Sequence, residues 1–350
     1  IMAVFGTCGG GMAVAAGMAD FTFMEEKSAQ LFVNAPNALE GNYKAKCDTA
    51  AAAFQSKESG VVDFTGDEAS ILSQIRTLVS ILPANNEEDL SEEDCQDDLN
   101  RMCSGIEGLA GDPIQVLSMI SDNHFVMEVK KDYEPSMVTA FIRLNGVTVG
   151  CVANRTERYE DGKKADEFEA ALSGKGCDKA VELISFCDAF SIPLLTLTNV
   201  NGYKAKMCSE RRIARAAARL TYAYADATVP KVTVVTGKAL GSAGLTMGSK
   251  SLGTDLVYAW PNAVIGTMEP EAAVKIMYAK EIEASDDAVA LISEKTAEYT
   301  KTQSGAVAAA RRGYADDIIK AEETRQRLAA AFDMLYTKSE DRPSKKHGTV

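Results

Sequence analysis

The chain has 350 residues, 46% of them hydrophobic and 25% charged, which is the composition of a folded protein long enough for two buried cores. Fifty acidic against thirty-seven basic residues give a net charge of -13, which argues against nucleic acid or an anionic membrane as the main partner. Eight cysteines without a CxxC pair and only two histidines argue against a zinc site, a disulfide framework and a histidine-based triad. We therefore expect a cytoplasmic protein with reduced thiols and no metal site.

Strand-like and helical runs alternate along the chain, and this alternation predicts an α/β fold. In chain order we expect strands at 1–5, 21–24 and 30–33, a helix at 68–82, strands at 126–129, 139–144 and 147–152, a helix at 175–190, a strand at 194–197, a helix at 209–227, a strand at 232–236, and helices at 271–280 and 322–335. Residues 1–19 carry no charge, but their five glycines and the lack of a basic region before them argue against a signal peptide or a membrane span. Because the chain starts inside an apolar run, we expect its native N-terminus to be missing.

An acidic run divides the chain. Residues 85–98 carry eight carboxylates and no base, which is typical of a solvated linker. We therefore predict an N-terminal domain portion at 1–84, an acidic linker at 85–111 and a C-terminal domain at 112–350.

Two segments on either side of this run share an order of features. In each, a strand leads into a turn of small residues, and an aspartate then opens the next apolar run. Gly11 lies nine positions before Asp20, and Ala243 lies twelve before Asp255, so the match needs a gap of three residues. The pattern predicts two copies of one fold.

A turn of small residues between a strand and a helix lets the backbone approach a ligand and points N–H groups of the helix start at an anion. The backbone N–H groups of Gly10 and Gly11, and those of Ser242 and Ala243, are therefore candidates for two oxyanion sites that need no catalytic side chain. The alternative is that these residues only permit close packing of helix and strand. Their repetition favours the oxyanion interpretation.

Residues 204–219 form a basic segment in this acidic chain. Arg211, Arg215 and Arg219 are spaced by four, so they share one face of the helix predicted at 209–227. That face is a candidate site for phosphates or a carboxylate. The alternative is an arginine stripe paired with neighbouring acids at a subunit surface. Because GxxxxGK[ST], GxGxxG and GxSxG patterns are absent, the sequence does not favour ATP, NAD or serine-hydrolase chemistry.

Several segments together resemble the carboxyltransferase component of biotin-dependent acyl-CoA carboxylases, a family that includes propionyl-CoA carboxylase β and acyl-CoA decarboxylase α subunits. These segments are 6–11 (GTCGGG), 20–24 (DFTFM), 59–61 (SGV), 82–86 (LPANN), 150–154 (GCVAN), 186–194 (FCDAFSIPL), 227–234 (ATVPKVTV), 258–261 (YAWP) and 312–317 (RGYADD). The resemblance implies an α/β fold of tandem crotonase-like domains, each a ββα superhelix, with the N-terminal domain incomplete.

The resemblance also implies how the two turns act. The N–H groups near Gly10 and Gly11 would hold the enolate oxygen of an acyl-CoA thioester, and those near Ser242 and Ala243 the ureido oxygen of biotin, which is itself the base. Since the chain has no Met-Lys-Met attachment site, biotin would arrive on a biotin carboxyl carrier protein. The resemblance implies two other kinds of partner: a biotin carboxylase subunit or a membrane decarboxylase subunit, and further copies of this chain in a homo-oligomer, which would be a hexamer as in the family. It implies no nucleic-acid partner.

Gly244 and Leu245 stand where the family usually has tyrosine and aspartate, and the aspartate position is associated there with acyl-chain selectivity. By this resemblance we expect Gly244 and Leu245 to contact the substrate, and from the arginine face we expect Arg215 to do so. The implied function is carboxyl transfer between carboxybiotin and a short acyl-CoA, such as acetyl-, propionyl- or methylmalonyl-CoA. One alternative is the α subunit of a biotin-dependent, sodium-pumping acyl-CoA decarboxylase. Another is a non-catalytic scaffold paralogue.

Overall fold

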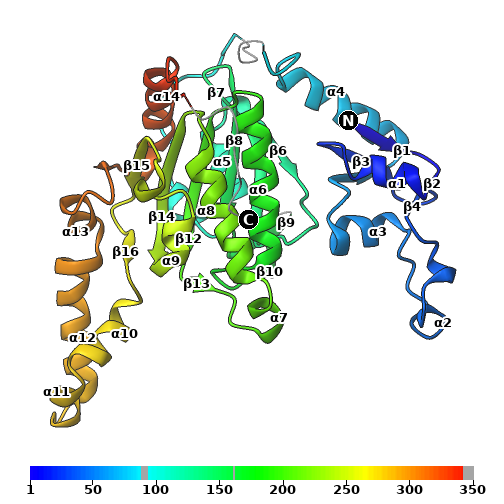
Figure 1. Cartoon of the computed structure of the whole chain (residues 1–350). Coiled ribbons are helices and arrows are strands. Elements are labelled where there is room, and N and C mark those ends of the chain that lie inside the picture. Colours follow the sequence, from blue (N-terminus) through cyan, green and yellow to red (C-terminus); the bar gives the residue numbers. More distant parts are fainter. Residues whose placement is uncertain (88–93, 161, 342–350) are drawn as a thin grey trace. The chain divides into compact units, whose positions relative to one another are not determined.

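The structure is a computed structural model that describes residues 1–87, 94–160 and 162–341. The chain forms two compact units (Figure 1). The first comprises Ile1–Ser91 with Met127–Pro135, and the second comprises Glu92–Val126 with Ser136–Val350. Because Met127–Pro135 groups with the first unit, the division is not a single cut along the chain. The boundaries predicted at 1–84, 85–111 and 112–350 stay a prediction.

The first unit is built on short parallel strands. Its elements are β1 (Met2–Val4), β2 (Thr7–Gly9), α1 (Gly11–Ala16), β3 (Thr22–Glu25), β4 (Gln30–Phe32), α2 (Asn42–Ala45), α3 (Ala52–Phe54), β5 (Phe64–Gly66) and α4 (Glu68–Ile81). One sheet has the order β1-β3-β5, and β2 pairs with β4 beside it. The aliphatic core includes Val4, Met24 and Leu31, all buried. Helix α4 begins where Asp67 accepts a hydrogen bond from the Ser70 N–H (2.7 Å).

The second unit has a larger mixed sheet with helices on both faces. The strands of this sheet include β7 (Met137–Leu144), β8 (Val147–Asn154), β12 (Leu194–Val200), β14 (Lys231–Leu240), β15 (Leu256–Ala259), β16 (Val264–Gly266) and β17 (Asp317–Ile318). Strands β11 (Ala171–Leu172) and β13 (Gly202–Tyr203) pair with each other in a separate two-stranded sheet. The order along the sheet is β17-β15-β14-β12-β8-β7, and β16 extends the pairing of β14. All eight residues of β7 are buried, as expected for a strand covered on both faces.

Helices α5 (Pro113–Ile120) and α14 (Thr324–Leu335) cover one face of this sheet, and α6 (Gly174–Ala189) and α8 (Ile213–Asp226) cover the other (Figure 1). Alternation along β7 serves both layers: Ala140 belongs to the core under α5 and α14, whereas the Phe141 ring contacts that of Phe186 on α6 (6.2 Å between centroids). Helix α8 is amphipathic and buries Ile213, Ala216, Leu220 and Tyr224.

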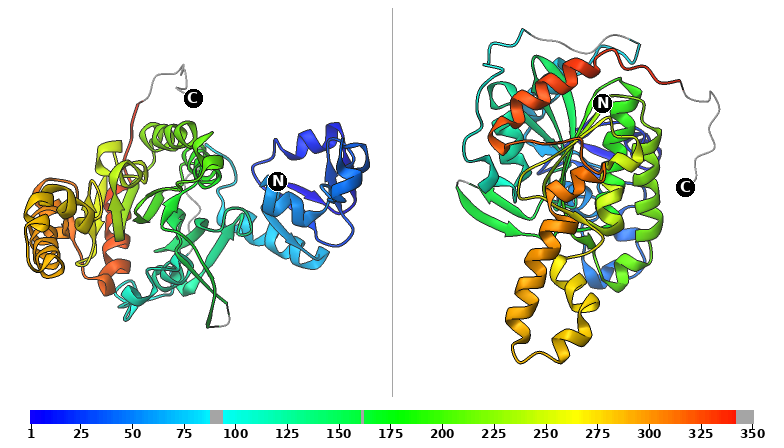
Figure 2. Two further views of the ribbon diagram at one scale, coloured as in Figure 1. Left: turned by 90° about the horizontal axis from the view of Figure 1, so that it is seen from below. Right: turned by 90° about the vertical axis from the view of Figure 1, so that its left-hand side faces the viewer.

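Three further helices extend from this unit. They are α10 (Pro270–Met277), α11 (Ala279–Glu283) and α12 (Ala288–Tyr299), which form a hairpin that projects away from the sheet (Figure 2) and leads into α13 (Ala306–Arg311). The sequence predicted a helix near α10 but not α12, although Asp287 caps α12 by accepting from the Ala290 N–H (3.0 Å). The remaining elements are β6 (Val126–Val129), α7 (Met207–Glu210) and the exposed strands β9 (Glu157–Glu160) and β10 (Lys163–Glu167).

Two predicted elements differ from the structure. The helix predicted at 209–227 is broken at Arg211 and Arg212 into α7 and α8, because Arg212 has non-helical backbone angles (φ -141°, ψ -9°). Its guanidinium is bonded to Asp178 on α6, so a contact between helices replaces continuation of the local pattern. The strand predicted at 232–236 continues to Leu240, where it pairs with β16.

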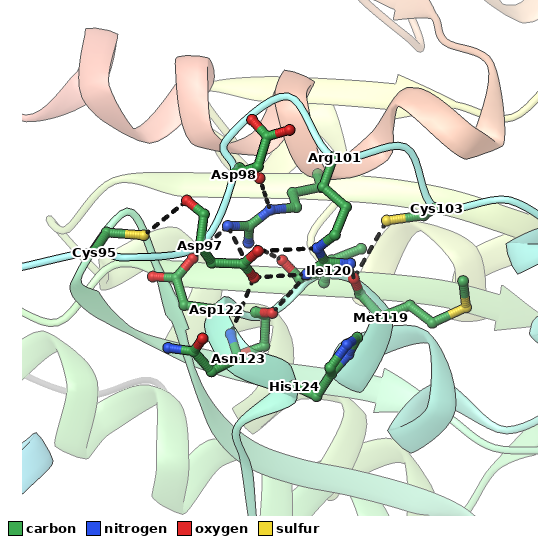
Figure 3. A network of polar contacts seen from close by, with 12 residues as sticks. Cys95, Asp97, Asp98, Arg101, Cys103, Met119, Ile120, Asp122, Asn123 and His124 are labelled. Atoms are coloured by element: carbon green, nitrogen blue, oxygen red, sulfur yellow. Dashed lines mark hydrogen bonds and ion pairs between the residues drawn. The ribbon is translucent and has the colours of Figure 1, made fainter.

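Part of the acidic run is not solvated. Residues 88–93 of the run lie outside the described residues, but Asp97 is only 13% exposed and pairs with Arg101 (2.9 Å) and Arg325 (3.4 Å). Arg325 on α14 is fully buried, and it also binds Asp122 (2.7 Å) and the Ile120 carbonyl (2.6 Å). Figure 3 shows Asp97 beside Arg101, with Asp122 close by. The prediction of a solvated segment is therefore wrong for Asp97, because a buried cation from the other end of the chain lies against it.

Candidate active site

Both units contain the same local construction, a strand that turns at a left-handed glycine into a six-residue helix. In the first unit β2 pairs with β4 as far as Gly9 opposite Phe32, Gly10 has φ 59°, and α1 follows. In the second, β14 pairs with β16 as far as Leu240, and Gly241, with φ 58°, is the first residue of α9 (Gly241–Thr246). A side chain at either position would be strained, which accounts for glycine at both.

This geometry also corrects the alignment of the two turns. Gly10 corresponds to Gly241, so Gly11 corresponds to Ser242, whereas the sequence comparison matched Gly11 with Ala243. The connection from helix to next strand is longer by four residues in the second unit, one more than the sequence match required. Two copies of one construction are therefore present, and the residues that correspond between them differ by one position from the match made on the sequence.

The first-turn N–H groups of a helix have no partner within it. In α9 these include the N–H groups of Ser242 and Ala243, as predicted for an oxyanion site. In the first unit, the Gly10 N–H already donates to the Phe32 carbonyl (2.9 Å), so it is engaged in the strand pairing and is not a free donor here. The N–H groups equivalent to those of Ser242 and Ala243 belong to Gly11 and Met12, both exposed.

A cavity of about 690 Å³ lies against α9 in the second unit. Its walls come from the ends of β12, β14 and β16, from α9, and from the segment between α12 and β17. Its lining includes the following residues: Thr198, Ala239, Gly241, Ser242, Gly244, Leu245, Lys250, Tyr299, Gln303, Arg312 and Tyr314. Three of the predicted site residues, Ser242, Gly244 and Leu245, are thus brought together on one wall, with Ala243 buried behind them.

Gly244 and Leu245 have different roles in this wall. A Cβ atom on Gly244 would lie 2.5 Å from the backbone carbon of Ala239, so the glycine lets α9 approach β14 closely. The Leu245 side chain is 51% exposed and lines the cavity. The resemblance led us to expect that residue 245 influences which acyl chain is accepted. The structure places the apolar side chain of Leu245 there, on the cavity wall.

Two cations that the sequence did not single out also line the cavity. Arg312 donates from both terminal nitrogens to the backbone carbonyl and Oε1 of Gln303, and among the described residues it has no carboxylate within ion-pair distance. Lys250 is neutralised by Asp316 (2.9 Å). Arg312 belongs to the 312–317 motif, which was the available signal, but nothing in its local sequence indicated that it lines the cavity beside α9.

Arg215 is not part of this cavity. It lies on the exposed face of α8, and within the described ranges its side chain has no carboxylate partner. Arg219, one turn further along, lies 3.6 Å from Asp178. The helix break removes Arg211 from α8, so the predicted arginine face of three residues is reduced to Arg215 and Arg219 on that helix.

Comparison with known proteins agrees with this architecture. A model of the carboxyl transferase domain matches residues 1–350. The chain is 37% identical over 362 residues to the methylmalonyl-CoA decarboxylase subunit alpha of Propionigenium modestum, covering 100% of this chain and 68% of the relative. It is 38% identical over 358 residues to a putative propionyl-CoA carboxylase beta chain of Bacillus subtilis, covering 100% of this chain and 69% of the relative.

A solved structure of transcarboxylase 12S, a hexamer with methylmalonyl-coenzyme A and methylmalonic acid bound, superposes with a TM-score of 0.88 at 35% identity, over 99% of this chain and 67% of that chain. The predicted α/β class with crotonase-like units is confirmed by this match. No helix in the described part of the chain is both long and apolar enough to cross a membrane. The resemblance drawn from the motifs is likewise confirmed, and the chain belongs to the carboxyl transferase domain family.

Proposed function

We propose that the protein transfers a carboxyl group between biotin, held on a separate carrier protein, and a short acyl-CoA, with propionyl-CoA and methylmalonyl-CoA as the substrate pair. The observation that carries this proposal is the repeated helix start at α1 and α9, which provides two sets of backbone donors for two developing anions. The relatives named for methylmalonyl-CoA and propionyl-CoA support the choice of acyl group.

Each turn has a separate role in the proposal. The N–H groups of Ser242 and Ala243 hold the ureido oxygen of biotin at the floor of the cavity beside α9. Those of Gly11 and Met12, with Gly10 shaping the turn, hold the thioester oxygen of the acyl-CoA as the α-carbon loses its proton. Backbone donors fixed by a helix need no rearrangement when charge develops, so they stabilise the enolate more than the thioester.

The cavity fits the group that it is proposed to hold. It combines backbone donors at its base with apolar and hydroxyl-bearing walls, including Leu245 and Tyr314, and it has room for a bicyclic urea. When bound, biotin supplies the carboxyl group and the base. The side chains of this chain therefore have to position and enclose the reactants rather than exchange protons with them.

The direction of flux has two candidates because relatives of both kinds match at similar identity, 37% for a decarboxylase subunit alpha and 38% for a carboxylase beta chain. The same carboxyl transfer operates in either direction. A biotin carboxyl carrier protein, together with a biotin carboxylase subunit or a membrane decarboxylase subunit, is the proposed set of partners, and a hexamer of this chain is the proposed assembly. A cytoplasmic location is proposed from the cysteine pattern of the sequence.

The test supplies methylmalonyl-CoA and free biotin to the protein in its native assembly and follows propionyl-CoA by chromatography, with malonyl-CoA and acetyl-CoA as the second pair. We expect turnover with at least methylmalonyl-CoA, and we expect avidin to abolish it because avidin sequesters biotin. Ser242→Pro serves as the matched inactive control. Lack of turnover with both acyl-CoA compounds, from a folded assembly, would overturn the proposal in favour of a scaffold role.

A further inference from the structure

The segment after β12 places an unusual concentration of positive charge next to α9. Strands β12 and β14 are parallel neighbours, with Val200 opposite Ala239, so the chain that leaves β12 emerges at the same sheet edge as α9. The contact is direct, because the Tyr203 hydroxyl lies 3.0 Å from Thr246 Oγ1 on α9. The residues that follow Tyr203 therefore flank the candidate active site.

These residues form a basic surface, which we define as 204–219. They contain six cations and one carboxylate, in a chain whose net charge is -13: Lys204, Lys206, Glu210, Arg211, Arg212, Arg215 and Arg219. Asp178 on α6 binds Arg212 and lies near Arg219. Among the described residues, the side chains of Lys206, Arg211 and Arg215 have no carboxylate partner, and all three are exposed.

An apolar side chain lies inside this basic surface. Met207, at the start of α7, is 79% exposed. An apolar contact surrounded by a charged rim is typical of a protein interface, where the apolar group is buried on association and the charges steer the partner. A site for phosphates alone has no use for an exposed methionine. The spread of the cations over α7 and α8 is likewise wider than a single phosphate group requires.

The position of Arg212 shows that part of this surface is fixed. Its guanidinium is bonded to Asp178, and its aliphatic stem lies over Gly174, where an added Cβ would come within 3.2 Å of Arg212 Cγ. This contact anchors the turn between α7 and α8. Arg211 and Arg215, which have no carboxylate partner among the described residues, flank Arg212 in the sequence and therefore lie next to an ordered turn.

We infer that the basic surface docks the biotin carrier through acidic residues around its biotinylated lysine, with Met207 as the apolar contact. This inference rests on the proposed function, because it assigns the partner that brings biotin to the cavity beside α9. The charges act on capture of the carrier and not on the chemistry at Ser242. They would raise the rate of encounter and lower KM for an acidic carrier, in a manner that salt suppresses.

The test compares two biotinylated peptides that differ only in charge, one with aspartate and glutamate around the biotinyl-lysine and one with asparagine and glutamine. Carboxyl transfer from methylmalonyl-CoA to each peptide, and to free biotin, is measured at low and high salt. We expect KM for the acidic peptide to be about tenfold lower at low salt, with the ratio approaching one at high salt.

The test variant is Lys206→Glu with Arg211→Glu, for which the ratio of the two KM values should fall to about one or reverse. The control is Arg327→Glu on α14, at the opposite end of this unit from α7 (Figure 1), for which the ratio should remain as in the wild type. Met207→Ser should raise KM for both peptides and leave free biotin unaffected, because it removes the apolar contact and no charge.

Three results would overturn the inference. The first is an unchanged KM ratio in Lys206→Glu/Arg211→Glu. The second is a rise in KM for methylmalonyl-CoA with the ratio preserved, which would assign the surface to CoA phosphates. The third is dissociation of the assembly of the Lys206→Glu/Arg211→Glu variant, measured by sedimentation velocity, which would assign the basic surface to contacts between copies of this chain. Failure of the wild type to turn over free biotin would overturn the proposed function and this inference together.

Discussion

Ser242 separates the contribution of a side chain from that of the backbone. It is the second residue of α9, where its N–H has no partner within the helix. Ser242→Ala keeps that N–H, so we expect it to retain most of the carboxyl-transfer rate. Ser242→Pro is sterically tolerated in a first helical turn but removes the N–H, so we expect a loss of about 100-fold or more.

Initial rates with free biotin and methylmalonyl-CoA measure this difference, and thermal unfolding of both variants serves as the control for folding. Comparable rates for the alanine and proline variants would contradict the role of the backbone donor. A loss in the alanine variant alone would instead assign the role to the serine hydroxyl.

Individual residues also show where sequence reasoning stops. The construction of the two turns could be predicted, because glycine and small residues between a strand and a helix indicate a helix start with exposed backbone N–H groups. That these groups hold oxyanions stays a prediction. The register could not be predicted, since only pairing of Gly10 with Phe32 reveals which N–H groups are engaged. Arg312 was missed for a related reason: the fold, and not its local sequence, brings it to the cavity that α9 also lines.

At the scale of helices and strands, hydrophobic periodicity was a good guide where one element packs by itself against the core. The predicted helix at 175–190 and the observed α6 at Gly174–Ala189 agree closely. Hydrophobic periodicity was a poor guide where a contact between elements overrides the local pattern, as at Arg212. It also failed for α12, because that helix has no buried residue to give a periodic signal.

Packing of α6 on β8 depends on the absence of a side chain at Gly150. A Cβ atom there would lie 2.3 Å from the Sγ atom of Cys187, and both residues are buried. We expect Gly150→Ala to lower the free energy of unfolding by about 1–3 kcal/mol, because the helix or the thiol has to move. Burial raises the pKa of the Cys187 thiol, so it acts as a neutral packing group.

Urea titration of the variants measures this effect. Cys187→Ala should partly rescue Gly150→Ala, because it removes the atom that the new methyl group meets, so the double variant should be more stable than the sum of the single changes predicts. Gly202→Ala is the matched control, since an added Cβ there has no heavy atom within 4 Å. Strict additivity in the double variant would show that the clash is relieved elsewhere.

At the scale of the second unit, buried charges join segments far apart in sequence. Arg325 on α14 contacts Asp97 and Asp122, so a residue of the acidic run and a residue just after α5 are held on the C-terminal helix. Bidentate hydrogen bonding from Arg101, with Arg325 nearby, holds the pKa of Asp97 below its ordinary value. Removing one partner of such a buried pair is more costly than the pair is worth, because it leaves the others unneutralised.

The lowered pKa of Asp97 predicts a pH dependence of stability. A carboxyl group whose pKa is lower in the folded state contributes stability that is present above its unfolded pKa, near 3.9, and is lost as pH falls below it. We therefore expect the wild type to lose more of its free energy of unfolding between about pH 5 and pH 2 than Asp97→Asn, which has no proton to take up. At neutral pH the full contribution of Asp97 is present in the wild type, so the variant should be the less stable protein.

Fluorescence of Trp260 reports this unit specifically, because it is the one tryptophan in the sequence and its indole N–H donates to Thr324 (3.0 Å), the residue before Arg325. Urea titrations followed through Trp260 at several pH values give the slope of the free energy of unfolding against pH for each protein. Asp94→Asn is the matched control, since Asp94 belongs to the same acidic run but is exposed. If both variants keep the wild-type slope, Asp97 does not govern acid stability. If only Asp97→Asn flattens it, a carboxylate from a run of linker-like composition stabilises the C-terminal helix.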